Sequence, residues 1–498
     1  MSALQESTPQ EESRSRRAQV SGRLARTLAA GSVLVEREDL KPYECDGLSA
    51  YRATPLVAAI PADEAEVAEV LAVARETGTP VVARGSGTGL SGGALPLPDG
   101  ILLSLAKFNR IVEVDPLART ARVQPGVTNL RISQHVAPLG LYYAPDPSSQ
   151  IACSIGGNVA ENSGGVHCLK YGLTVHNVLR VRAMTIEGDA VELGSEALDA
   201  PGYDLLALVT GSEGLLAVTL EVTVKLLPKP ELAQVVMASF RDVESAGEAV
   251  ANVIGAGIVP AGLEMMDRLA TRAVEDFVHA GYDLQAEAIL LAESDGTREE
   301  VADETARMIE AMRASGATDI RCSSSEPERL RFWSGRKAAF PAVGRISPDY
   351  YCIDGSIPRG ALAGVLKRIE ELSAQYGLRC ANVFHAGDGN LHPLILYDAN
   401  VPGELERTER FAADILELCI EVGGTITGEH GVGVEKINQM CVQFRPEEIA
   451  QFHAVKAAFD PEGLLNPGKA IPLLARCAEY GAMRVKGGAL PHPDLPRF

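Results

Sequence analysis

The stretch that decides the fold is RGSGTGLSGG, residues 84–93, which follows directly on a short β-like run. Residues 87–92 satisfy the GxGxxG pattern, but in a nicotinamide-dinucleotide fold this loop must open a helix. Here Pro96 and Pro98 follow, and two prolines at this spacing disfavour a continuing helix. The sequence therefore predicts a loop whose exposed N–H groups hold a pyrophosphate, with Arg84 adding positive charge. A plain flexible loop is the alternative.

A second turn-rich region spans residues 144–172, APDPSSQIACSIGGNVAENSGGVHCLKYG. Its small residues and hydrogen-bonding groups suit close wrapping of the backbone around a large, planar, polar ring. Between Pro55 and Arg84 the pattern is strand–helix–strand. Residues 232–380 alternate short strands with helices, which predicts an antiparallel sheet covered by helices in an α+β domain. Pro228 and Pro230 mark the expected domain boundary.

Length and charge restrict the function further. A chain of 498 residues is expected to form two or three domains, and its net charge of −20 makes nucleic acid an unsuitable partner. No apolar run is long enough for a membrane span, and the N-terminus has no signal-peptide pattern, so a cytoplasmic location is expected. The nine cysteines are scattered and form no CxxC pair. This argues against a disulfide framework, a zinc ribbon or an iron–sulfur cluster held by this chain alone, and predicts reduced thiols.

The sequence HAGDGNLHP, residues 385–393, combines a hairpin signal with two histidines in a geometry that suits chelation of one metal ion. Asp388-Gly389 indicates a two-residue hairpin turn, which would place His385 directly opposite His392, about 5 Å apart at Cβ. Glu429 in the later sequence GEHG could supply a third ligand. The alternative is a structural hairpin whose histidines are exposed or hydrogen-bonded. Arg336 is the expected clamp for a substrate carboxylate, because its planar fork suits a bidentate pair.

These sequences, together with GSEGLLAV and DPEGLLNPGK, resemble the FAD-linked 2-hydroxy-acid oxidases and dehydrogenases of the vanillyl-alcohol oxidase fold type. Within that family they are similar to the FAD-binding catalytic subunits of bacterial glycolate dehydrogenases. The resemblance implies an α+β fold: a two-subdomain FAD-binding domain, an α+β cap, and a C-terminal helical segment that returns to the FAD domain. The expected divisions are a polar tail at 1–17, a helical segment at 18–53 with a helix near 20–30, the FAD domain at 54–230, the cap at 231–425, and the C-terminal segment at 426–498.

The resemblance also assigns roles to residues. His430 is the implied catalytic base, and His385, His392 and Glu429 match a divalent-metal site for zinc, manganese or iron. FAD is expected to be non-covalent, because the first glycine loop contains no histidine tether. The implied cofactor-binding residues are Arg84, Gly85, Ser86, Gly87, Thr88, Gly89, Leu90, Asp146, Ser149, Ser154, Gly156, Gly157, Asn162, Gly165, Glu213 and Gly214.

The implied reaction is the oxidation of glycolate to glyoxylate, or of D-lactate to pyruvate, by hydride transfer to flavin. Cys352 and Leu394 stand where some members carry groups that hold a second carboxylate, which favours a small monocarboxylate over 2-hydroxyglutarate. The implied partners are a second flavin-type subunit and an iron–sulfur subunit, through which the chain would lie at the cytoplasmic side of the inner membrane. The alternatives are a stand-alone D-lactate dehydrogenase and a non-catalytic flavin-binding scaffold subunit.

Overall fold

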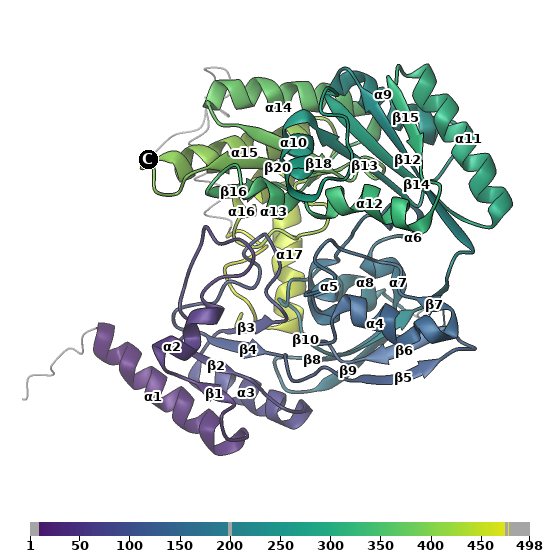
Figure 1. The fold of residues 1–498 in the computed structure, drawn as a ribbon. Coiled ribbons are helices and arrows are strands. Elements are labelled where there is room, and N and C mark those ends of the chain that lie inside the picture. The colour runs from purple at the N-terminus through teal and green to yellow at the C-terminus, as the bar shows by residue number, and fades with distance from the viewer. Residues whose placement is uncertain (1–8, 198–201, 474–476, 478–498) are drawn as a thin grey trace, which may run out of the picture.

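The computed structural model describes residues 9–197, 202–473 and Cys477. Figure 1 shows two parts stacked on each other: a lower part that contains two sheets from the first half of the chain, and an upper part built on one larger sheet. Residues 1–8 of the expected tail and residues 478–498 of the expected C-terminal segment lie outside the described residues.

The first lower sheet contains the predicted strand–helix–strand unit. Its order is β1-β2-β4-β3, and β2 and β3 each pair in parallel with β4. The bounds are β1 (Val33–Leu34), β2 (Val57–Ala59), β3 (Val81–Arg84), β4 (Ile101–Ser104), α1 (Pro9–Thr27) and α3 (Glu64–Thr77). Helix α3 buries Val67, Val70, Leu71 and Ala74, the apolar stripe that its 3.6-residue period requires, against this sheet. Helix α1 begins at Pro9, well before the expected start near residue 20.

The second lower sheet is antiparallel and has the order β5-β6-β10-β8-β9. Its strands are β5 (Ile111–Asp115), β6 (Thr120–Val123), β8 (Val178–Met184), β9 (Ala190–Gly194) and β10 (Val218–Lys225), with helices α4 (Asn129–Val136) and α5 (Ile155–Glu161) packed beside it. Ile132 of α4 and Ile155 and Val159 of α5 are fully buried in the apolar cluster formed with this sheet. Within the second turn-rich region, α5 is the longer helix and it packs on this sheet.

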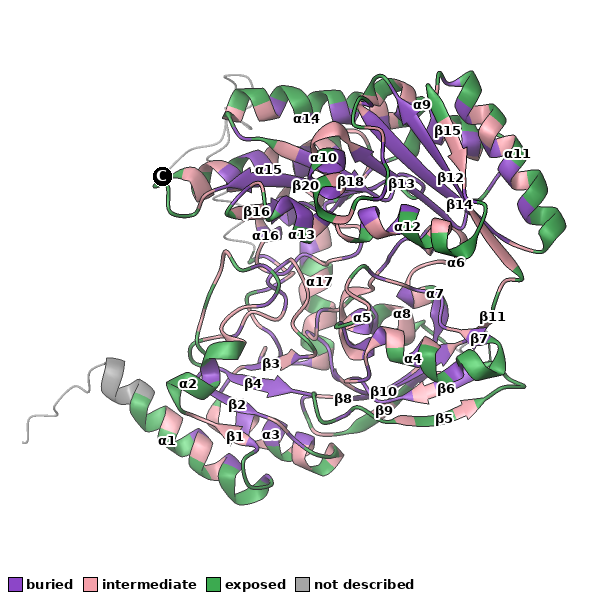
Figure 2. Cartoon of the chain, viewed as in Figure 1, coloured by how far each residue is buried: buried purple, intermediate pink, exposed green. Residues whose placement is uncertain are grey.

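The cap is the predicted antiparallel sheet with helices, in the order β15-β12-β14-β13-β18-β20-β16. Both faces of this sheet are buried, as the alternating residues of β12 show. Val236, Ala238 and Phe240 point into one apolar cluster. Val235 and Met237 point into another on the opposite face. Figure 2 shows the inner strands of this sheet, such as β13 and β14, mostly buried, with the exposed sides of the helices facing outward. The cap strands are β12 (Leu232–Phe240), β13 (Gly262–Asp267), β14 (Ala288–Gly296), β15 (Asp319–Cys322), β16 (Asp349–Cys352), β18 (Cys380–Phe384) and β20 (Pro393–Tyr397). The cap helices are α9 (Val243–Gly255), α10 (Arg268–Val278), α11 (Arg298–Ala314), α12 (Glu326–Lys337), α13 (Ala339–Val343), α14 (Leu362–Tyr376) and α15 (Glu404–Glu421).

The C-terminal segment returns to the lower part, as the family resemblance implies. After α16 (Ile437–Gln443) and α17 (Pro446–Phe459), the chain runs in parallel beside β3. Val81 N–H donates to the Leu464 carbonyl and Asn466 N–H donates to the Val81 carbonyl, each at 2.8 Å. Residues 464–466 thus extend the edge of the first sheet, beside β3, the strand that leads into the glycine-rich loop.

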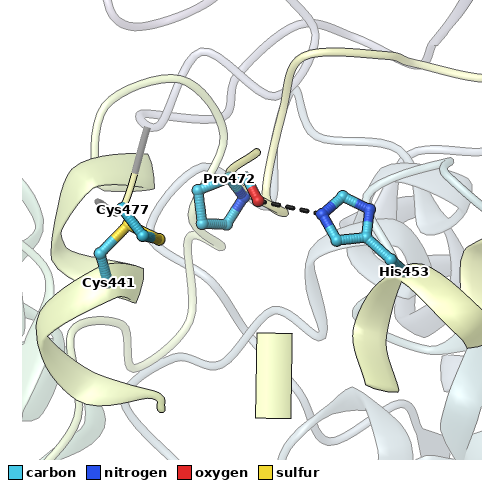
Figure 3. The surroundings of a disulfide bond; sticks show 4 residues. All are labelled: Cys441, His453, Pro472 and Cys477. Carbon is cyan, nitrogen blue, oxygen red and sulfur yellow. Dashed lines mark hydrogen bonds between the residues drawn. A yellow bond between two sulfur atoms is a disulfide. The ribbon is translucent and has the colours of Figure 1, made fainter. Parts of the chain in front are cut away.

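One cysteine pair corrects the expectation of reduced thiols. Cys441 of α16 and Cys477 form a disulfide across a sequence separation of 36 residues, with their Cα atoms 5.1 Å apart (Figure 3). In the same region His453 Nε2 lies 3.0 Å from the Pro472 carbonyl oxygen. A disulfide needs close Cα atoms, and this proximity arises only because the chain turns back after α17. The spacing of the cysteines along the sequence did not reveal it.

Shorter elements complete the fold. They are α2 (Arg37–Leu40), β7 (Leu141–Tyr142), α6 (Cys168–Tyr171), α7 (Thr174–Asn177), α8 (Leu205–Val209), β11 (Leu227–Pro228), β17 (Gly355–Ser356) and β19 (Asn390–Leu391), with single 3₁₀ turns at Lys41–Tyr43, Ala137–Leu139 and Arg359–Ala361. In the part of the chain that the structure describes, no helix, long or short, is both long and apolar enough to cross a bilayer.

Candidate active site

A cleft runs between the two glycine-rich regions. The loop after β3 contains no helix between Gly85 and Gly100, as predicted from its prolines. The cleft begins at this loop, passes the N-terminal end of α5, and reaches Glu429 and His430. One continuous space therefore joins the predicted phosphate loop to the predicted catalytic base.

Glycines are required where the two regions approach each other. A Cβ on Gly85 would lie 2.2 Å from Ser154 Oγ, and a Cβ on Gly156 would lie 2.5 Å from Pro125 Cβ. Gly87 has a φ of +69°, which side chains disfavour. The N–H groups of Ser86 to Gly89 find no protein acceptor within the described chain. N–H groups without a protein acceptor in a glycine-lined loop fit the pyrophosphate of FAD.

Most of the implied cofactor residues line this cleft. They are Arg84, Gly85, Ser86, Gly87, Thr88, Gly89, Ser149, Ser154, Gly156, Gly157, Glu213 and Gly214. Arg84 Nη1 also donates to the Cys45 carbonyl oxygen at 2.8 Å, and burial lowers the pKa of Arg84. The position of Arg84 at the mouth of the loop agrees with the charge expected there.

Four implied residues do not line the cleft, and each has another role. Both Asp146 carboxylate oxygens are bonded to His167, through its backbone N–H at 3.1 Å and its Nδ1 at 2.8 Å. Asn162 ends α5 in the left-handed region, and its side chain accepts from Val175 N–H. Gly165 packs on the backbone of Asp146, and Leu90 packs against an apolar cluster of the cap. The sequence could not distinguish these supporting positions from lining ones, because both need small or polar residues.

The predicted hairpin forms, but its register differs from the expected one. His385 pairs with Asn390 instead of His392, and the intervening loop has four residues. The loop is closed by Gly389 N–H, which donates to the His385 carbonyl, and by Asp388, which accepts from Asn390 N–H. Aspartate commonly caps its own turn in this way. A shift of two residues keeps His392 on the same face of the hairpin. The histidines therefore meet diagonally, with ring centroids 5.2 Å apart.

The predicted metal ligands converge. His392 Nε2 lies 3.0 Å and His385 Nε2 lies 3.5 Å from Glu429 Oε1, and all three side chains are buried. Their ligand atoms lie within 4.8 Å of one another. The other oxygen of this carboxylate, Glu429 Oε2, is buried and has no hydrogen-bond partner among the described residues. Two imidazole nitrogens and a carboxylate around a common point, with one oxygen unsatisfied, fit a divalent cation.

Both histidines of the predicted metal site are oriented by hydrogen bonds at Nδ1. His385 Nδ1 lies 2.7 Å from Glu264 Oε1, and His392 Nδ1 lies 3.2 Å from the Ile353 carbonyl oxygen. These partners accept Nδ1–H and leave Nε2 available as the ligand atom, the arrangement usual for metal-binding histidines. Glu264 gave no signal in the sequence, since it is a single acidic residue beside Leu263 and Met265 in a short strand.

The electrostatics centre on Glu429. Burial alone would raise the pKa of this carboxyl, but hydrogen bonds from His385, His392 and His430 hold its pKa well below the usual value. Burial alone would lower the pKa of His430, yet the Glu429 carboxylate, 3.3 Å away, raises it. The carboxylate remains ionised and ready to hold a cation.

Arg336 lies behind the metal ligands and does not line the cleft. Its Nε donates to Glu264 Oε2 at 2.7 Å, and both side chains are only 1% exposed. The expected two-pronged clamp is therefore partly engaged by a protein carboxylate. Arg336 Nη2 is buried without a partner in the described part of the chain, so one donor remains for a ligand.

Comparison with known proteins identifies the family. Residues 55–194 match the FAD binding domain family, and residues 229–470 match the family of FAD linked oxidases, C-terminal domain. The glycolate oxidase subunit GlcD of Escherichia coli K12 is 65% identical over 466 residues, which cover 94% of this chain and 93% of that protein. The chain belongs to the FAD-linked oxidases. It is 38% identical to the glycolate oxidase subunit GlcD of Bacillus subtilis, covering 86% of this chain and 91% of that protein. It is 33% identical to a D-lactate dehydrogenase of Archaeoglobus fulgidus, covering 82% and 90%.

Solved structures confirm the predicted fold class. The oxidase superposes on p-cresol methylhydroxylase with a TM-score of 0.78 at 17% identity, covering 93% of this chain and 98% of that one. The 4-ethylphenol oxidase of Gulosibacter chungangensis gives a TM-score of 0.76 at 16% identity, covering 92% and 98%. At these identities the likeness establishes the fold alone.

Glu213, one of the implied cofactor residues, also holds the loop that follows His430. Glu213 accepts N–H bonds from Val432 and Gly433 in the loop after His430. Glu161 lies beside it, and burial raises the pKa of both carboxyls. Glu161 lines the cleft but was not singled out in the sequence, where it stands among glycines and asparagines.

Proposed function

We propose that this FAD-linked oxidase converts a small 2-hydroxy acid, with glycolate as the first candidate, into the 2-oxo acid. The observation that supports this most is the continuity of the cleft, which runs from the phosphate-type loop to His430 and the buried ligand cluster. The high identity to proteins named as glycolate oxidase subunits agrees with it.

Three groups of this chain would act on the substrate. Arg336 lies behind the wall of the cleft, and its buried Nη2, which has no partner among the described residues, would have to reach the substrate carboxylate through that wall. His430, at the end of the cleft, would accept the hydroxyl proton. His385, His392 and Glu429 would hold a divalent cation: zinc, manganese or iron.

FAD, when bound, supplies the acceptor for the hydride that leaves the substrate α-carbon. A cation, when bound, would supply a Lewis acid that polarises the substrate hydroxyl. The chain itself would position the reacting groups. The glycine loops would let the backbone approach the cofactor closely. Glu264 and the Ile353 carbonyl orient His385 and His392, respectively. Non-covalent FAD follows from a first loop that offers no side chain for a tether.

The cap supports a small substrate. Cys352 Sγ lies 3.8 Å from His392 Nδ1, so position 352 borders the metal histidine. Cys352 and Leu394 are both buried, and neither can neutralise a second carboxylate. This arrangement favours glycolate or D-lactate over a dicarboxylate.

The likeness to a D-lactate dehydrogenase keeps D-lactate as the second substrate. A scaffold subunit that only binds flavin has no need of a buried cation site with oriented histidines, so we set that alternative aside. The test is anaerobic mixing of the FAD-bound chain with glycolate, D-lactate and D-2-hydroxyglutarate. We expect the first two to bleach the flavin and the third to leave it oxidised. If no 2-hydroxy acid bleaches it, the proposed function fails.

Electrons would leave through partner proteins. The similar proteins are named as subunits, which supports a complex. We propose a second flavin-type subunit and an iron–sulfur subunit, which would place the chain at the cytoplasmic face of the inner membrane. A tagged pull-down from the native host should recover a cysteine-rich iron–sulfur protein. Quinone reduction by the isolated chain as fast as by cell extract would contradict this.

A further inference from the structure

The loop that carries Glu429 and His430 is held by one buried carboxylate outside the cleft. Asp354 follows β16 and is 2% exposed. Its Oδ1 accepts N–H bonds from Gly428 at 3.2 Å and Glu429 at 3.1 Å. Its Oδ2 accepts from Thr427 Oγ1 at 2.7 Å and from His430 N–H at 2.9 Å.

A buried lysine completes this arrangement. Lys436 is fully buried, and its Nζ donates to Asp354 Oδ2 and to the Gly431 carbonyl, each at 2.9 Å. The lysine therefore neutralises the carboxylate and ties the far end of the same loop to it. Charge-assisted hydrogen bonds of this kind are about twice as strong as neutral ones.

The residue before Asp354 holds the other half of the site. The Ile353 carbonyl lies 3.2 Å from His392 Nδ1. Ile353 and Asp354 thus connect His392 of the hairpin to the loop of Glu429 and His430. That loop lies more than 30 positions after His392 in the chain.

Asp354 could instead be regarded as a metal ligand, since Asp354, His392 and His430 also offer atoms within 4.8 Å of one another. The hydrogen bonds argue against this. Both Asp354 oxygens already accept from protein donors, whereas Glu429 Oε2 has none among the residues described. A cation at Asp354 would have to break the bonds that shape the loop.

We infer that Asp354, paired with Lys436, is a positioning residue that sets the Glu429 carboxylate and the His430 imidazole in their places at the site. It acts through backbone N–H groups and touches neither substrate nor cofactor. Removing its charge should leave the fold and FAD binding in place while the loop loses its fixed geometry.

The test compares Asp354→Asn with wild type in the FAD-bound full chain. Hydrogen exchange of the peptide containing residues 428–430 should be at least about tenfold faster in the variant, because its amides lose a charged acceptor. The affinity for added Zn²⁺ or Mn²⁺ should fall about 10- to 100-fold, as for other groups that orient ligands. Asp267→Asn is the control, since Asp267 is a partly buried acceptor of two backbone N–H bonds, from Ala270 and Asn382, and makes no hydrogen bond to residues 427–431. The control should leave both readouts unchanged.

Wild-type exchange at residues 428–430 in Asp354→Asn would overturn the inference. If that variant does not fold, Thr427→Val removes one bond to the same carboxylate and should still raise the exchange of this peptide; no increase would overturn the inference equally. The metal arm rests on the proposed cation site, and the kinetic arm rests on the proposed reaction: kcat should fall in Asp354→Asn with little change in KM. The exchange and metal arms remain informative if no 2-hydroxy acid reduces the wild type.

Discussion

Replacing Glu264 with Gln tests the buried contacts that join Arg336 to His385, one of the predicted metal ligands. The Glu264 carboxylate serves Arg336 Nε through one oxygen and His385 Nδ1 through the other, each at 2.7 Å. Glutamine keeps the shape and one acceptor, but its amide N–H₂ must face a donor. The substitution therefore leaves the Arg336 cation buried without its counter-charge.

The expected cost is large because both partners are only 1% exposed. Breaking a buried ion pair by removing one partner costs about 3–5 kcal/mol. In a unit of the cap's size, each kcal/mol of lost stability lowers the melting temperature by about 2–4 °C. The substitution should therefore lower the melting temperature by roughly 6–20 °C. The double variant Glu264→Gln/Arg336→Met should be less destabilised than Glu264→Gln alone, since the uncompensated cation is gone.

The assay uses the natural probe in the cap. Trp333 is the single tryptophan of the chain and is buried on α12, so its fluorescence reports unfolding of the cap. The metal content of the folded protein is measured in parallel. The metal affinity should fall about 10- to 100-fold, because His385 loses the carboxylate that orients it. The ion-pair reasoning would be refuted if Glu264→Gln lowered the melting temperature by less than about 2 °C. It would also be refuted if Glu264→Gln/Arg336→Met were less stable than Glu264→Gln.

Three further predictions concern the cleft and its end. His430→Asn should fold and bind FAD but turn over roughly 100-fold more slowly, measured as anaerobic flavin reduction; an unchanged rate would remove His430 as the base. His392→Ala should lose bound metal together with activity, measured by metal analysis of purified protein, whereas full activity without metal would show that the hairpin acts through hydrogen bonds alone. Gly85→Ala should weaken FAD binding, because the added Cβ would lie 2.2 Å from Ser154 Oγ, and titration of the FAD-free chain with FAD is the measurement. Gly140→Ala is its control, since a Cβ there meets no atom within 4 Å although its positive φ adds strain; equal FAD affinity in the two variants would contradict the close-approach argument.

Local chemistry in the sequence was sufficient for much of the fold. The prolines after the glycine loop excluded a helix, and the apolar stripe of α3 and the alternation in the cap gave the right elements. The register of the hairpin was wrong because Asp388-Gly389 favours a two-residue turn locally, whereas the folded chain closes a four-residue loop. The histidines still converge because a shift of two residues preserves the face of a strand.

The parts of the site that were missed depend on long-range proximity. Glu264, Asp354 and Lys436 are single charged residues in apolar or mixed surroundings, and only the fold brings them to the ligands. The disulfide between Cys441 and Cys477 was missed for the same reason. The role of Arg336 as a carboxylate clamp stays a prediction, and its buried partner Glu264 could not be inferred from sequence spacing.

The most direct test of the proposed chemistry is the rate of anaerobic flavin bleaching in the isolated, metal-loaded chain with ordinary glycolate and with glycolate deuterated at the α-carbon. If the substrate carbon–hydrogen bond breaks as the flavin is reduced, both substrates bleach the flavin and the deuterated one does so more slowly. His430→Asn should slow both reactions. Absence of bleaching by glycolate, or bleaching in the wild type that is insensitive to deuterium and to His430→Asn, would contradict hydride transfer from a 2-hydroxy acid at this site.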